Sequence, residues 1–233
     1  KMKAYSTITN IQVDDNAANQ WKNQVPVKLE ELKKEVSSND GWKLHSEEAG
    51  VKRYIKDEAI AKYKAVGTIK TKMTAKQFIQ WLAALQKDMK LRGSLFPTIM
   101  EVKTIQLKQF TEEENKSYEV EWALLETPSS LVANRELQML RMYDFGSDNE
   151  AYVIGFSIDH PNFPKTKGFV VSTIKITGWK VVKKDADTLE VVFITQNDPG
   201  GWLPSKLSTN AMLENLLIIN KYANLIKQQE SKK

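Results

Sequence analysis

The sequence of 233 residues contains no cysteine. This absence excludes disulfide bonds, zinc–thiolate sites and thiol nucleophiles. Histidine is almost as scarce, because only His45 and His160 are present, and a histidine-rich metal site is excluded with it. No apolar run approaches the roughly 20 residues that a membrane-spanning helix needs. We therefore predict no metal, no cofactor and no catalytic residues.

What is present is ordinary for a globular protein, with 41% hydrophobic and 27% charged residues. The net charge of +5 favours an anionic surface such as a phospholipid membrane. Nucleic-acid-binding domains concentrate basic residues more sharply, so we expect no nucleic-acid partner, and we expect a monomer. The lack of cysteine and the start at Lys1 favour an exported protein whose signal peptide has been removed, with a cytoplasmic location as the alternative.

Helical and strand patterns alternate in the first part of the chain. Residues 1–25 are polar and mixed, with Asp14-Asp15-Asn16 as a possible helix start. Pro26 then opens a predicted amphipathic helix that ends before Gly41. Thr74 and Gln77 match a capping box, and the segment behind them has an apolar stripe at helical spacing. Between these two helices, three short strands are predicted, at residues 42–47, 51–56 and 61–70.

The second part of the chain changes to strand patterns separated by turn residues. No helical pattern lies between these strands, so the sheet should be antiparallel. The predicted strands are residues 99–110, 117–125, 136–145, 151–158, 168–182 and 188–196.

A single long helix is predicted over residues 204–228, and it is apolar over most of its circumference. Such a helix must be buried on more than one side. A helix of 25 residues is about 37 Å long, and strands of nine to twelve residues span about 30–40 Å. A curved sheet could therefore wrap the helix along its whole length. A ligand cavity between the two and a fully packed core are both compatible with this geometry.

Several motifs in the second part resemble the steroidogenic-acute-regulatory-related lipid-transfer family, the START domain. The run that leads into the terminal helix is the most specific of them. In chain order the motifs are Asn134-Arg135-Glu136-Leu137, Gly155-Phe156-Ser157-Ile158-Asp159-His160-Pro161, Pro164-Lys165-Thr166-Lys167-Gly168-Phe169-Val170, Thr177-Gly178-Trp179 and Asp198-Pro199-Gly200-Gly201-Trp202-Leu203-Pro204. Glu136 departs from the aspartate of the family, and Val171 or Ser172 stands where an arginine is frequent.

The resemblance covers residues 20–228 and implies an α+β helix-grip fold. In this fold a curved antiparallel sheet wraps a long C-terminal helix around an internal apolar cavity. Residues 1–19 are then an extension and residues 229–233 a polar tail. The implied function is to bind one lipid molecule, such as a sterol or phospholipid, and to carry it between membranes without catalysis. Two alternatives are a helix-grip cyclase or hydrolase acting on a hydrophobic small molecule, and a lipid-sensing module.

Charged residues in the predicted strands indicate a polar part of the site. Arg141 shares a strand face with Met139 and Tyr143, because alternate residues point the same way. If that face is inward, the guanidinium needs a partner, and Glu121 is the candidate. The resembled family has a glutamate–arginine pair that binds a ligand hydroxyl or head group, although a purely structural pair is also possible here. The predicted ligand contacts are Glu121, Trp122, Met139, Arg141, Tyr143, Phe156, Met212, Leu216 and Ile219.

A proline-bearing loop over residues 159–167 is the predicted entrance for the lipid. The resemblance implies that this loop or the C-terminal helix moves. Pro161 and Pro164 flank Phe163, which lies near the loop tip with Lys165 and Lys167 behind it. An exposed aromatic residue among lysines could dip into an anionic membrane surface. The alternative is that Phe163 packs under its own loop.

Overall fold

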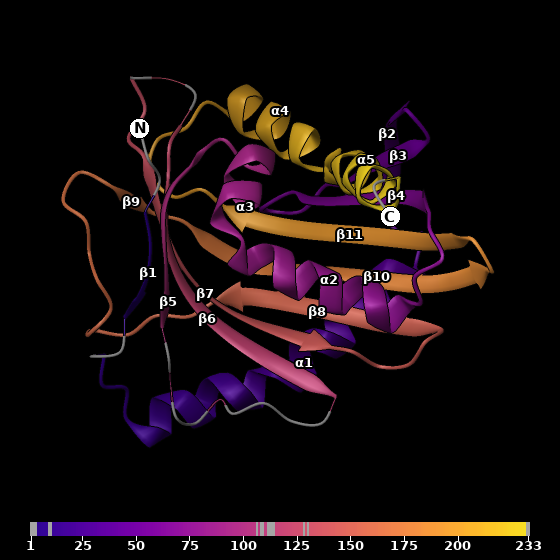
Figure 1. Ribbon diagram of the computed structural model, residues 1–233. Helices are drawn as coiled ribbons and strands as arrows, with labels where there is room; N and C mark the ends of the chain where they lie inside the picture. Colours follow the sequence, from indigo (N-terminus) through magenta and orange to yellow (C-terminus); the bar gives the residue numbers. More distant parts are fainter. Residues whose placement is uncertain are drawn as a thin grey trace.

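The structure is a computed structural model that describes residues 4–8, 11–105, 107, 110, 115–127, 129 and 131–231. A curved sheet forms the centre of the molecule, and helices cover both of its faces (Figure 1). The helices are α1 (Asp15–Ser37), α2 (Ala75–Lys87), α3 (Met89–Leu95), α4 (Ser205–Asn215) and α5 (Ile218–Glu230). In Figure 1, α4 and α5 run along the top of the sheet and α1 lies beneath it.

Most strands follow the predicted pattern, and the predicted antiparallel sheet is confirmed. The predicted strand 168–182 is divided into two strands, at Val170–Val171 and Thr173–Asp185, and the strand Ala4–Ile8 was not predicted. In sheet order they are β1 (Ala4–Ile8), β5 (Ile99–Ile105), β6 (Lys116–Leu125), β7 (Arg135–Asp144), β8 (Glu150–Ser157), β10 (Thr173–Asp185), β11 (Thr188–Asp198), β4 (Lys62–Lys70), β3 (Val51–Lys56) and β2 (Trp42–Glu48). Two short strands pair in parallel: β1 with β5, and β9 (Val170–Val171) with β7. The pairing of β11 with β4 joins the early hairpins to the later strands.

Helix α1 starts at the possible helix start of Asp14-Asp15-Asn16 and not at Pro26. Its N-cap is Asp14, whose carboxylate accepts a hydrogen bond from the amide of Ala17 at 2.9 Å. Pro26 therefore lies inside the helix and does not open it, so that prediction is wrong. Proline removes one hydrogen bond of the helix. The buried residues Trp21 and Leu32, on either side of it, hold the helix against the sheet nevertheless.

The capping box at the start of α2 is confirmed, because Thr74 and Gln77 exchange both hydrogen bonds. A second, short helix that was not predicted follows directly as α3. Asp88 caps it by accepting a hydrogen bond from the amide of Leu91 at 3.0 Å. This helix turns the chain back toward the sheet and carries Arg92 into the interior.

The predicted terminal helix is broken into two, which corrects the expectation of one continuous helix. The break falls at Leu217, whose ψ of 3° interrupts the helical hydrogen-bond ladder. Arg53 of β3 donates to the carbonyl of Leu213 at 3.3 Å, and so satisfies a group that the end of α4 leaves open. Buried positions differ greatly between the halves: Leu213 in α4, but Ile218, Ile219, Tyr222 and Ile226 in α5.

Two separate apolar cores form, one on each face of the sheet. The inner core lies between the sheet and helices α2 and α5, and includes Phe78, Trp179 and Ile219. The outer core lies between the sheet and α1, and includes Leu32 and Ile154. Alternation along each strand decides which residues enter which core. Within the described residues, no helix is long and apolar enough to cross a membrane.

Candidate functional site

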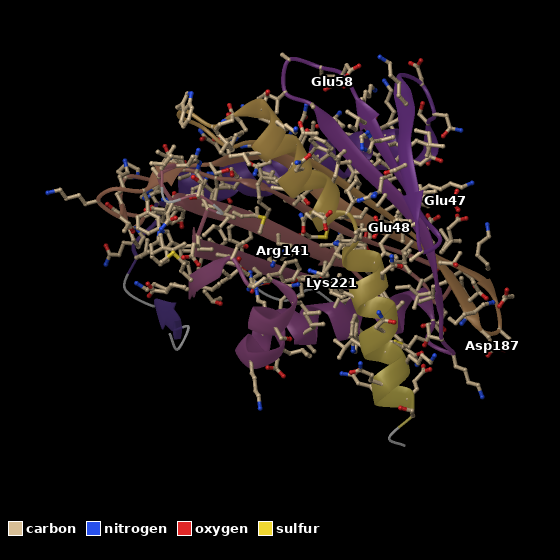
Figure 2. All side chains as sticks on the ribbon, turned by 90° about the horizontal axis from the view of Figure 1, so that it is seen from above. Glu47, Glu48, Glu58, Arg141, Asp187 and Lys221 are labelled. Atoms are coloured by element: carbon tan, nitrogen blue, oxygen red, sulfur yellow. The ribbon has the colours of Figure 1, made fainter. Side chains whose placement is uncertain are left out.

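Four charged side chains meet on the inner face of the sheet. Glu119 and Glu121 come from β6, Arg141 comes from β7, and Arg92 reaches them from α3. Glu119 and Arg141 are direct partners in the register of β6 and β7. Figure 2 shows Arg141 in the middle of the molecule, away from the rim where Glu47, Glu58 and Asp187 lie. We call Arg92, Glu119, Glu121 and Arg141 the charge cluster.

The charge cluster is held by short, charge-assisted hydrogen bonds. Arg92 binds Glu121 through both terminal nitrogens, at 2.9 and 2.6 Å. A terminal nitrogen of Arg141 lies 3.0 Å from Glu119 and 3.5 Å from Glu121. The hydroxyl of Tyr143 donates to Glu119 at 2.9 Å. Bidentate arginine–carboxylate geometry is both strong and directional, so the four groups fix one another's positions.

Helix α5 supports the charge cluster from the other side. Lys221 of α5, which Figure 2 labels, donates to the carbonyl of Leu95 at 3.0 Å. That carbonyl ends α3, the helix that carries Arg92, so it would otherwise lack a partner. The C-terminal helix therefore holds α3, and through it Arg92, against the sheet.

Burial and charge act in opposite directions on the groups of the cluster. Burial alone would raise the pKa of Glu121, but the charges of Arg92 and Arg141 outweigh it and hold the pKa below its usual value. Burial alone would lower the pKa of Arg92, but the carboxylate of Glu121 outweighs it, and the pKa is raised. Burial also raises the pKa of Tyr143. Glu121 and both arginines therefore stay charged at neutral pH, and Tyr143 stays protonated.

Two polar atoms of the charge cluster lack a hydrogen-bond partner within the described part of the chain. They are Nε of Arg92, a donor, and Oε1 of Glu119, an acceptor. Both atoms are buried, and Arg92 and Glu119 are only 4% and 7% exposed. Buried polar atoms in folded proteins almost always have a partner, and leaving an atom of a charged group without one is costly. This pair of open positions is what makes the cluster a candidate binding site.

Tyr222 of α5 lies near the charge cluster, and other aromatic side chains pack around it. The ring of Tyr222 lies 5.5 Å from those of Trp81 and Trp179, and Trp179 stacks on Phe193 at 4.5 Å. Burial raises the pKa of Tyr222, while the positive charges of Arg141 and Arg92 act on it in the opposite direction. Tyr222 is therefore near enough to the charge cluster for the charges of its arginines to affect the pKa of Tyr222. The site thus combines a polar end with an apolar, aromatic wall.

Most of the predicted contact residues lie on the inner face. Glu121 and Arg141 come within hydrogen-bonding distance, and Tyr143 bonds to the same cluster. Met139 alternates in register with Arg141, so it points the same way. The predicted helix residues also face this side: Leu216 and Ile219 are buried in the inner core and Met212 packs against it. Whether a ligand touches them stays a prediction.

The structure corrects the predicted placement of Trp122 and Phe156 at the ligand site. Both lie in the outer core against α1, on the opposite side of the sheet from α5. The reason is strand alternation: Glu121 points inward, so its neighbour Trp122 must point outward. The same alternation in β8 turns Phe156 outward. These two residues cannot line a site under the C-terminal helix.

The predicted entrance loop also differs from expectation. Phe163 is 3% exposed, and its ring lies 5.7 Å from those of Trp21 and His160. It packs between its own loop and α1, so the loop does not present an exposed aromatic residue. Pro161 is exposed and Pro164 is half-buried. The alternative interpretation, in which Phe163 is a packing residue, describes the structure.

Sequence reasoning missed Arg92 and Glu119. Glu119 lies two residues before Glu121, so the two-residue period of a strand could have placed both on one face. Arg92 offered no such signal, because it belongs to a seven-residue helix whose sequence resembles a polar connection. Only the tertiary structure brings it to Glu121.

Comparisons with known proteins agree with this architecture. Human STARD10 has a TM-score of 0.70 and 18% identity, over 95% of this chain and 84% of that one. Human StAR-related lipid transfer protein 5 has a TM-score of 0.71 and 17% sequence identity, over 90% of this chain and 96% of that one. A STAR-related lipid transfer protein from Xanthomonas axonopodis has a TM-score of 0.59 and 20% sequence identity, over 79% of this chain and 97% of that one. No curated protein matches the chain in sequence. The family model of the START domain matches residues 22–218, and the chain therefore belongs to the START domain family.

Proposed function

We propose that this protein binds one lipid molecule between the sheet and α5 and carries it between membranes. The single observation that carries the proposal is the buried pair of open positions on Arg92 and Glu119 beside an aromatic wall. A sterol, a phospholipid or another amphiphile has the matching form, a polar end attached to an apolar body. Family membership and the printed names of the structural relatives support the same class of ligand.

The charge cluster favours a hydroxyl as the polar end of the ligand. Two arginines and two glutamates balance one another, so the cluster has no charge left for a phosphate. What stays open is one donor on Arg92 and one acceptor on Glu119. A hydroxyl group can act as the acceptor for a donor of the first kind and as the donor for an acceptor of the second kind. A neutral alcohol therefore fits better than an anionic head group.

A binding role fits the cluster better than catalysis does. General acid–base catalysis is most efficient when the pKa of the catalytic group lies near the working pH. The pKa of Glu121 is lowered, that of Tyr143 is raised, and both arginines stay protonated. The cluster thus positions a ligand without offering it a proton donor or acceptor poised for chemistry. We propose that the protein acts as a monomer that touches membranes transiently and binds no nucleic acid.

The proposal is tested by native mass spectrometry of the purified protein, followed by extraction and identification of the bound lipid. Binding is then measured with a panel of sterols, diacylglycerols, phospholipids and fatty acids. Glu119→Gln replaces an acceptor of the cluster with an amide and should weaken binding of a hydroxyl ligand about tenfold. Trp122→Phe, on the other face, is the matched control and should bind as the wild type does. A protein that binds no member of the panel contradicts the proposal.

A further inference from the structure

A row of polar side chains crosses the inner face of the sheet from the charge cluster to β4. Residues that lie directly opposite one another on neighbouring strands point to the same face of a sheet. Starting from the charge cluster, the residues paired in this way are Arg141 of β7, Gly155 of β8, Thr177 of β10, Thr195 of β11 and Tyr63 of β4. All of them except Gly155 carry a polar group, and we call Arg141, Thr177, Thr195 and Tyr63 the polar row.

The far end of the polar row contacts helix α4. The hydroxyl of Tyr63 donates to that of Thr209 at 3.4 Å. Tyr63 and its neighbour Thr195 are each 5% exposed, so the side chains at this end are largely shielded from water. A hydroxyl group offers one donor and two acceptor positions, so this bond leaves two positions on each hydroxyl for other partners. Because 3.4 Å is long for a bond between two hydroxyl groups, a ligand can replace it at little cost.

The polar row lies at the edge of the packed inner core. The next inward pair on the same two strands is Trp179 and Phe193, whose large rings stack on each other. In the row itself these strands carry only Thr177 and Thr195, which are much smaller. Helix α4, which contacts the row, buries Leu213 alone, whereas α5 buries four side chains. The row therefore marks the boundary between the aromatic wall and a less tightly packed part of the inner side.

Gly155 opens a path between the charge cluster and the rest of the polar row. It lies between Arg141 and Thr177 and has no side chain to separate them. A Cβ on Gly155 would lie 3.1 Å from the sulfur of Met139 and 3.1 Å from a methyl group of Thr177, so these two side chains lie over it. Methionine is unbranched and flexible, so Met139 can move when an apolar body enters. A ligand can therefore cross β8 at this point.

We propose that the ligand lies across the strands along the polar row, with one hydroxyl group at the charge cluster and a second at Tyr63 and Thr209. This inference rests on the proposed function and names its substrate class, a neutral amphiphile with a hydroxyl group at each end of an apolar body. Four steps separate β7 from β4 in the sheet. At about 4.8 Å per step, the path is about 19 Å long before the curvature of the sheet shortens it. Tyr63 and Thr209 determine the specificity, because their hydroxyl groups favour a polar chain end over an apolar one.

The experiment compares two probes that differ by one hydroxyl group, 1-tetradecanol and 1,14-tetradecanediol. Isothermal titration calorimetry of the full chain, after removal of copurified lipid, measures both dissociation constants. A site with one polar end would bind the diol more weakly, because burying a hydroxyl group without a partner costs free energy. The polar row predicts that the diol binds about fivefold more tightly than the alcohol. A preference of no more than about twofold, which the two equivalent ends of the diol supply by themselves, overturns the inference.

Variants of the far end test the same point. Tyr63→Phe/Thr209→Val removes both hydroxyl groups and changes the shape of the side chains little. It should reverse the preference for the diol, a change of about tenfold in the ratio of the two dissociation constants. The alcohol, whose hydroxyl lies at the charge cluster, should bind as it does to the wild type. Tyr54→Phe makes the same tyrosine substitution on the outer face and is the matched control, so it should keep the preference. If the two hydroxyl groups only tie α4 to the sheet, both probes will change equally and the inference is wrong.

Failure of the far end can be separated from failure of the proposed function. Glu119→Gln should weaken the alcohol and the diol by the same factor, since both place a hydroxyl group at the charge cluster. A wild type that holds lipid in native mass spectrometry but does not prefer the diol overturns only the contact with Tyr63 and Thr209. A wild type that holds no lipid and binds neither probe nor any member of the lipid panel overturns the proposed function itself. The comparison of the two probes on the wild type decides the inference even if the double variant does not fold.

Discussion

The two faces of the sheet both bury polar groups, but they satisfy them differently. On the outer face, the amine of Lys62 lies 2.8 Å from Glu35, and that of Lys64 donates to the carbonyl of Ser38 at 2.8 Å. Among the described residues, three buried atoms on that face lack a partner: the indole N–H groups of Trp42 and Trp122, which are neutral donors, and Oε1 of Glu136, an acceptor that strand alternation places on this face. On the inner face the open donor of Arg92 and the open acceptor of Glu119 both belong to the charge cluster, whose four members are linked by hydrogen bonds. The comparison teaches that an open buried atom does not by itself indicate a ligand, because such atoms occur on both faces. What distinguishes the inner face is that its open donor and acceptor belong to one hydrogen-bonded cluster of charged groups.

The largest loss of the free energy of unfolding should come from a substitution of Arg92 on the inner face. Arg92→Met leaves Glu121 buried with only the longer contact to Arg141, at 3.5 Å. Removing one member of a buried ion pair typically costs about 3–5 kcal/mol of the free energy of unfolding. Urea denaturation measures this loss. The double variant Arg92→Met/Glu121→Met removes both charges and should recover most of it. Strictly additive effects of the two substitutions would contradict a coupled pair.

The next largest effect should come from the outer face at Leu32. This side chain is fully buried between α1 and the sheet. Leu32→Ala should cost about 3 kcal/mol, the usual loss for a buried leucine that leaves a cavity. Lipid binding per folded molecule should stay unchanged, because α1 lies on the other side of the sheet. A matching loss of lipid affinity would show that the two faces are not independent.

A smaller difference is expected between two glycines that let helices approach the sheet. A Cβ on Gly178 would lie 2.4 Å from the carbonyl of Val153 and 2.8 Å from Leu32 of α1. A Cβ on Gly67 would lie 3.1 Å from side-chain methyl groups of Ile219 and Val51. Gly178→Ala must displace backbone and should cost about 1–3 kcal/mol. Gly67→Ala meets only side chains and should cost less. Thermal denaturation of both variants measures the order, and a reversed order would contradict the stated packing.

The smallest expected effect is the contribution of Lys64 to the pH dependence of the free energy of unfolding. Burial lowers the pKa of Lys64 to about 8, although its amine lies 4.4 Å from the ring of Trp42. Between pH 8 and its unfolded pKa of 10.5, the unfolded chain keeps a proton that the folded chain has lost. Stability from this group therefore rises with pH in that window, by about 1 kcal/mol per pH unit.

Lys64→Met is the control for this prediction. The free energy of unfolding of the wild type, measured relative to that of Lys64→Met, should increase between pH 8 and 10 and stay flat from pH 6 to 7. Urea denaturation at each pH gives both curves. A difference that falls as pH rises would show that the pKa of Lys64 is not lowered.

Local patterns predicted the fold well because they reflect local physics. The capping box of Thr74 and Gln77 and the strand boundaries from β2 to β11 depend on neighbours in the chain. Pro26 misled the prediction of α1, because packing of Trp21 and Leu32 against the sheet outweighs the hydrogen bond that proline removes. The break at Leu217 was missed for the same reason, since helical periodicity does not include contacts such as that of Arg53.

The site was predictable only in part. The two-residue period grouped Met139, Arg141 and Tyr143 correctly, but it could not decide which face was inward. Trp122 and Phe156 were therefore assigned to the wrong side. Arg92 could not be predicted, because its distance to Glu121 is set by how α3 folds back onto the sheet and not by its own neighbours.

The break between α4 and α5 divides the C-terminus into parts of different local stability. Helix α5 is anchored by four buried side chains and by hydrogen bonds from Trp81 to Gln229 at 3.0 Å and from Thr71 to Glu230 at 2.6 Å. Helix α4 has one buried side chain, Leu213. Amide hydrogens of α4 should therefore exchange with solvent through local opening, while those of α5 exchange only when the sheet itself unfolds. The last helix of the chain thus belongs to the folding unit of the sheet, and the helix before it does not.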